Sequence, residues 1–101
     1  MARETVSVEA DDPLIHLLRE EISDNDRKIV EALNVRLQLV ARLKQVKEER
    51  GLDFVDADRE EWLLQHLDGA NRGPLSAEGL REFYTELLDL TKRELDRDGD
   101  A

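Results

Sequence analysis

The sequence has no cysteine, few aromatic residues and little glycine or proline. Without cysteine the chain cannot form a disulfide, a thiolate nucleophile or a cysteine-based metal site. One tryptophan, one tyrosine and two phenylalanines are its only aromatic residues. Because sheets favour aromatic and β-branched residues, a chain dominated by Leu, Glu, Arg and Asp is expected to be all-α.

Long apolar runs and an excess of positive charge are also missing. No stretch approaches the roughly 18 apolar residues of a membrane span, and the N-terminal MARETVSVEADD is too polar for a signal peptide. The net charge of −10 argues against nucleic acid or an anionic membrane as a partner. We therefore expect a soluble, cytoplasmic protein that binds neither.

The longest predicted element is a helix near the N-terminus. Residues 1–11 are expected to form a flexible tail, and Asp12 and Pro13 have the pattern of a helix start. No glycine or proline occurs from Leu14 to Arg50, and Gly51 supplies the stop. The pattern predicts one helix of about 37 residues, roughly 56 Å long.

Two shorter helices are predicted after it. One is expected over residues 57–68, or one residue shorter. The segment 69–74 contains two glycines and a proline and is typical of a loop. Ser76 then caps a helix over residues 77–95, and residues 97–101 are expected to fray. Residues 12–96 thus form one helical domain.

The long helix carries more apolar surface than the other two helices can cover. They span roughly 17 Å and 30 Å, so part of the stripe needs a second copy of the chain. We therefore predict an intertwined all-helical homodimer; the alternative is a plain coiled-coil dimer of the long helix with a helical hairpin attached. The stripe residues, spaced by threes and fours, include Ile15, Leu18, Ile22, Ile29, Leu33, Val40 and Leu43.

Three cations on the long helix point to an anionic ligand. Arg36 and Lys47 occupy stripe positions about three turns, roughly 16 Å, apart. A buried cation needs an anionic partner; taken alone, each is a snorkelling side chain or the partner of a Glu. Arg19 lies about 25 Å from Arg36 and is rotated by roughly 100°, so one helix cannot bring both to a small ligand. In an antiparallel or crossed dimer, Arg19 of one chain can meet Arg36 and Lys47 of the other, and the cluster suits a dicarboxylate.

Arg59 is a further cation in an unfavourable position. It lies in the first turn of the second helix, after Asp56 and Asp58, where the helix dipole favours anions. For a lone arginine the ordinary interpretation is a surface ion pair. Together with the other cations, it would face an anionic ligand.

The order and spacing of these residues resemble the all-helical chorismate mutases. The matching elements are L-R-x-x-I-x-x-x-D at 18–26, L-x-x-R-L-x-L at 33–39, Lys47, D-x-x-R-E at 56–60 and G-P-L-S at 73–76. The resemblance covers about residues 14–95. Enzymes of this family convert chorismate to prephenate on the route to phenylalanine and tyrosine, by an intramolecular Claisen-type rearrangement that needs no nucleophile, metal or cofactor.

The resemblance assigns roles to the residues that match. Arg19 of the partner chain and Arg36 would bind the two carboxylates of chorismate. Lys47 would donate to the ether oxygen, where negative charge grows as the C–O bond breaks. Glu60 would accept from the substrate hydroxyl, with the backbone of Asp56 nearby.

The resemblance also assigns roles to residues at the mouth of the site and on the third helix. Arg59 would add positive field at the mouth, and Thr91 takes a small polar position. The family usually places Gln, sometimes Glu, late in the third helix to bond the ether oxygen. One register puts Leu95 there and a register shifted by one residue puts Glu94 there; Glu94 is preferred because the chemistry needs a donor.

Other functions fit parts of the pattern. An isochorismate pyruvate-lyase uses a similar scaffold. A helical dimerisation or regulatory module of low activity would be favoured by Leu95 at the ether position. A generic coiled coil predicts the stripe but not Arg36 and Lys47 on it. His16 and His66 are isolated in the sequence and are expected on the surface.

Overall fold

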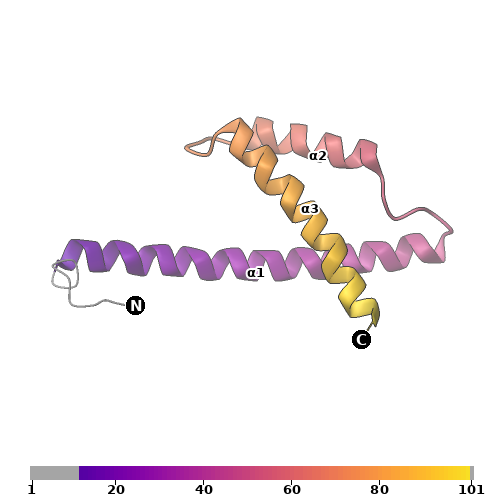
Figure 1. The fold of residues 1–101 in the computed structure, drawn as a ribbon, viewed down its shortest axis with the longest axis horizontal. Helices are drawn as coiled ribbons and strands as arrows, with labels where there is room; N and C mark the ends of the chain where they lie inside the picture. The colour runs from indigo at the N-terminus through magenta and orange to yellow at the C-terminus, as the bar shows by residue number, and fades with distance from the viewer. Residues whose placement is uncertain (1–11, 101) are drawn as a thin grey trace. The chain divides into compact units, whose positions relative to one another are not determined.

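The computed structural model describes residues 12–100, with side chains through residue 97, and the predicted tail lies outside this range. The described residues form three helices, α1 (Pro13–Glu49), α2 (Ala57–Ala70) and α3 (Ala77–Asp100), and no strand (Figure 1). The all-α prediction is confirmed. None of the described helices is long and apolar enough to cross a membrane.

Helix α1 begins and ends as the sequence predicts. The Asp12 carboxylate accepts a hydrogen bond from the Leu14 amide at 2.9 Å, so it caps the helix. At the other end Gly51 adopts a φ of 67°, the left-handed region that glycine enters without steric cost. The Leu52 amide then bonds back to the Lys47 carbonyl at 2.8 Å, closing a glycine-terminated helix end.

Helix α2 is longer than predicted, because it continues through Gly69 to Ala70. A glycine inside a helix costs stability but does not forbid the conformation. The stop is set by Asn71 instead. Its amide side chain donates to the Leu75 carbonyl at 2.8 Å and accepts from the Gly73 amide at 2.9 Å. These local bonds hold Asn71 in the loop.

Helix α3 begins at its predicted cap and ends later than expected. The Ser76 hydroxyl accepts from the Gly79 amide at 2.9 Å. The helix reaches Asp100, so residues 97–100, predicted to fray, continue it. Arg97 in the last turn favours this extension, since a cation there complements the helix dipole and Arg97 pairs with Glu94 one turn earlier.

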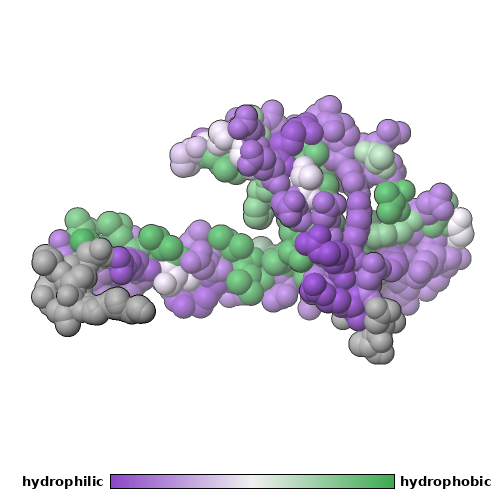
Figure 2. Space-filling model, in the orientation of Figure 1, coloured by the Kyte–Doolittle hydropathy of each residue, from purple (hydrophilic) through white to green (hydrophobic). Residues whose placement is uncertain are grey.

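The chain divides into two compact units, Met1–Arg36 and Leu37–Ala101, and α1 runs through both. In the first unit the described residues form only the N-terminal part of α1. Leu14, Ile22 and Val30 are 61%, 59% and 57% exposed, and no residue of α1 is buried. Figure 2 shows this apolar surface in green along the helix.

The second unit contains the buried core of the described chain. Leu80, Leu87 and Leu95 are its buried apolar residues, and Thr91 is its buried polar residue. All four lie on α3, at spacings of seven, four and four residues, and so share one face. The Thr91 hydroxyl donates to the Leu87 carbonyl at 2.7 Å, so this buried group has an acceptor on its own helix.

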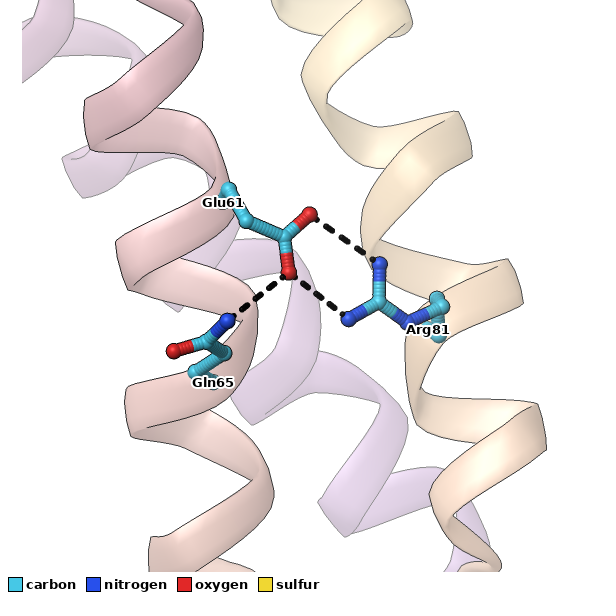
Figure 3. Close-up of polar contacts among 3 residues, drawn as sticks. All are labelled: Glu61, Gln65 and Arg81. Carbon is cyan, nitrogen blue, oxygen red and sulfur yellow. Dashed lines mark hydrogen bonds and ion pairs between the residues drawn. The ribbon is translucent and has the colours of Figure 1, made fainter.

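An ion pair joins α2 to α3 within the second unit. The guanidinium of Arg81 contacts both carboxylate oxygens of Glu61, at 3.0 and 3.4 Å, and Gln65 donates to the same carboxylate at 3.3 Å (Figure 3). The hydrogen bond and the charge of Arg81 lower the pKa of Glu61, and Glu61 in turn raises the pKa of Arg81. Both side chains are about half exposed, so water weakens the pair.

Candidate active site

Lys47 is held in place at the C-terminal end of α1. Its side chain is half-buried, and Nζ donates a hydrogen bond to the Phe54 carbonyl at 3.2 Å. The backbone carbonyl of Lys47 also receives the Leu52 amide. The connection between α1 and α2 therefore forms two hydrogen bonds with this lysine, one to its ammonium group and one to its backbone carbonyl. The chain itself thus positions the ammonium group.

Asp56 is the cap of α2 and faces the same hollow as Lys47. It has an extended backbone, and its carboxylate accepts from the Arg59 amide at 3.1 Å. Its backbone is thereby fixed at the start of the helix. The hollow is lined by Lys47, Leu52, Asp53, Val55, Asp56, Ala57 and Asp58.

The charges around this hollow do not suit a dianion by themselves. One lysine faces three aspartates, at positions 53, 56 and 58. A ligand with two carboxylates would therefore need further cations from elsewhere. Arg19 and Arg36 are the cations that the sequence predicts, and both lie in the first unit, Arg19 exposed and Arg36 half-buried.

Arg59 has an aromatic neighbour on its own helix, Trp62. Its guanidinium lies 3.9 Å from the centroid of the Trp62 ring, a cation–π contact. The Trp62 ring in turn stacks on the ring of His66, which is nearly parallel to it, with 4.7 Å between the ring centroids. The cation–π contact explains how an arginine is tolerated in the first turn of α2. The sequence indicates this contact, because side chains three residues apart on a helix are neighbours.

Glu60 pairs with a lysine of α3. The carboxylate oxygen Oε2 lies 3.1 Å from Nζ of Lys92, and the two side chains are 31% and 37% exposed. The sequence indicates Glu60 but not Lys92 as a site residue, because nothing in the spacing of α2 and α3 shows which faces of the two helices meet. Lys92 directly follows Thr91, which does lie on the buried face of α3.

The two candidates for the ether-oxygen position are in different environments. Leu95 is 7% exposed and shares the inward face with Thr91. Glu94 is one-third exposed and pairs with Arg97 on the same helix. Leu95, and not Glu94, therefore lies on the same face as Thr91, while the residue at the ether oxygen stays a prediction.

Residues 18–95 match the family described as chorismate mutase type II. The chain belongs to the chorismate mutase type II family. This confirms the resemblance inferred from the sequence.

No cluster of three or more His, Cys, Asp or Glu side chains that could hold a metal ion occurs among the described residues.

Two solved structures share the fold. Form I of chorismate mutase from Thermus thermophilus matches with a TM-score of 0.74 and 32% identity, over 76% of this chain and 96% of that one. Form II from the same organism matches with a TM-score of 0.77 and 31% identity, over 82% and 94% of the two chains.

A relative in sequence is larger. The bifunctional chorismate mutase/prephenate dehydratase of Pseudomonas aeruginosa is 29% identical over an alignment of 84 residues, and the match covers 78% of this chain. This chain spans 23% of that relative's length. The similarity thus concerns about a quarter of the bifunctional protein.

Proposed function

We propose that this chain catalyses the rearrangement of chorismate to prephenate. The observation that carries the proposal is the position of Lys47. Within the segment that matches the family, its half-buried ammonium group is anchored beside the hollow that also contains Asp56. A preorganised donor aimed at a developing oxyanion is the kind of group this reaction requires.

The proposed roles follow from the chemistry of the side chains. Lys47 donates to the ether oxygen as the C–O bond breaks. Glu60 accepts from the substrate hydroxyl, and Arg36 with Arg19 of a partner chain binds the two carboxylates. Holding the reactive conformer supplies the rest of the rate enhancement. The substrate reacts within one molecule, so no nucleophile of the protein takes part.

The roles of the remaining site residues are smaller. Arg59 adds positive charge at the mouth of the site while its guanidinium stacks on Trp62. Thr91 lies on the inward face of α3, and Asp56 contributes its fixed backbone at the start of α2. A cytoplasmic location stays a prediction from the sequence.

We propose further that the active protein is an intertwined homodimer whose sites each use both chains. Two observations support this. Large apolar side chains are exposed along α1, and α1 contains no buried residue. The hollow beside Lys47 also lacks the positive charge that a dicarboxylate needs. A second copy would cover the apolar stripe and supply the missing arginine. Sedimentation should find a species of twice the 11.7 kDa chain mass; a monomer at the concentrations of the assay would contradict the dimer.

The proposed reaction is tested by incubating the purified protein with chorismate. Loss of chorismate absorbance and formation of prephenate, seen by NMR, are expected. A rate equal to that of the solution without protein would contradict the proposal. The same protein should be incubated with isochorismate, because release of pyruvate would identify the lyase alternative.

One observation favours a second candidate, a helical module of low activity. Leu95 cannot donate a hydrogen bond, and it is Leu95 that faces inward with Thr91. In that case chorismate would be bound but converted slowly. Tight binding by calorimetry with a rate near that of the uncatalysed reaction would identify this outcome.

A further inference from the structure

Two adjacent glutamates of α2 each pair with a cation of α3. Glu60 contacts Lys92 and Glu61 contacts Arg81. The pairs differ in exposure: the side chains of Glu60 and Lys92 are 31% and 37% exposed, whereas those of Glu61 and Arg81 are 50% and 54% exposed. The two cations lie about three turns, roughly 16 Å, apart along α3. Each pair braces the same two helices, but at a different place.

Only one of these glutamates has a proposed part in the reaction. Glu60 would accept a hydrogen bond from the substrate hydroxyl, yet a lone carboxylate next to a dianionic substrate would repel it. Lys92 removes this conflict, because it cancels the charge of Glu60 at 3.1 Å. The pair engages Oε2 of the carboxylate. Since a carboxylate has about four lone-pair sites on two oxygens, Oε1 can still accept from the hydroxyl.

We infer that Lys92 is a positioning residue of the active site, which fixes the Glu60 carboxylate and neutralises it toward a dianionic substrate. The inference rests on the proposed mutase function. Lys92 acts through Glu60 and needs no contact with the substrate. Because substrate and transition state carry the same net charge, the loss of Lys92 should weaken the binding of both about equally.

The test is to compare Lys92→Met with Arg81→Met in the full-length protein. Lys92→Met should raise KM for chorismate about fivefold, with kcat nearly unchanged. A rise of about fivefold is the effect in water of one uncompensated unit charge, here on Glu60, roughly 4 Å from a charge of the substrate. Arg81→Met removes the other brace between the same helices and should leave KM within about twofold of the wild type. Circular dichroism should show that both variants are folded. Equal KM values for the two variants would reduce Lys92 to a structural brace and overturn the inference.

Two further variants separate charge from packing. Lys92→Arg restores the cation and should return KM to near the wild-type value. In a Glu60→Gln background the carboxylate charge is already gone, so Lys92→Met should raise KM by clearly less than in the wild type. An undiminished effect in that background, or no rescue by arginine, would contradict the inference. A wild-type protein that does not convert chorismate would instead overturn the proposed function itself.

Discussion

Lys47 is held by contacts of its own chain before any substrate arrives. The Phe54 carbonyl accepts from its ammonium group, and Leu52 bonds to its backbone. A donor fixed in this way costs no reorganisation during the reaction. Its identity as a candidate was readable from the sequence, because a lysine interrupts an apolar stripe. The hydrogen bonds that hold Lys47 could not be predicted from the sequence, because a short connection without a strong turn motif does not reveal its hydrogen bonds.

We expect Lys47→Ala to lower kcat by about 10²–10³, the typical cost of removing one oxyanion donor. The fold should remain, since Lys47 is only half-buried. Lys44→Ala is the matched control: it lies on the same helix, with Nζ 5.8 Å from the centroid of the Phe54 ring. Steady-state kinetics and circular dichroism check both variants. A Lys47→Ala enzyme with near-normal turnover would remove Lys47 from the ether site.

We expect Glu94→Gln to keep the wild-type rate and pH profile, because Glu94 pairs with Arg97 and Leu95 faces inward. A glutamate at the ether oxygen could donate only when protonated, so its rate would fall as the pH rises through its pKa, and glutamine would flatten that fall. The measurement is kcat/KM between about pH 5 and pH 9. An alkaline limb that Glu94→Gln flattens would place Glu94 at the ether oxygen after all.

At the scale of helices, the local signals in the sequence identify the starts well and the ends less well. Asp12 and Ser76 cap α1 and α3 as predicted. The predicted end of α2 comes too early. Glycine is a typical helix breaker, but the helix continues through Gly69 and ends at Ala70, where the side-chain bonds of Asn71 stabilise the loop. Which helix faces pair also required the structure. The pairs Glu60–Lys92 and Glu61–Arg81 join residues far apart in sequence, and no periodicity indicates them.

The Glu61–Arg81 pair predicts an acid-sensitive contribution to stability. Arg81 lowers the pKa of Glu61 below its ordinary value of 4.5 in the folded state. The unfolded chain therefore binds the proton more readily, so the contribution is complete at pH values above 4.5 and is lost as the pH falls through the lowered pKa. Glu61→Gln should melt slightly below the wild type at neutral pH, with the difference vanishing in acid. Thermal melts as a function of pH provide the measurement, and Arg81→Met should show the same pattern. A difference that persists unchanged in acid would contradict this account.

At the scale of the whole molecule, the described chain buries very little. Leu80, Leu87 and Leu95 are its buried apolar residues, whereas α1 exposes many. Helix lengths and the stripe indicated this mismatch from the sequence alone. The geometry of the proposed dimer could not be predicted in the same way, since it depends on how the surfaces of two copies of the chain fit each other.

The most direct test of a two-chain active site is to mix inactive variants. Arg19→Ala and Arg36→Ala should each be nearly inactive toward chorismate, since each loses one carboxylate-binding arginine. When they are unfolded and refolded together, about half of the dimers should combine one chain of each kind, and each such dimer has one intact site. The mixture should therefore recover up to about a quarter of the activity of wild-type protein refolded in parallel. No recovery in the mixture, while refolded wild type is active, would contradict a site shared between two chains.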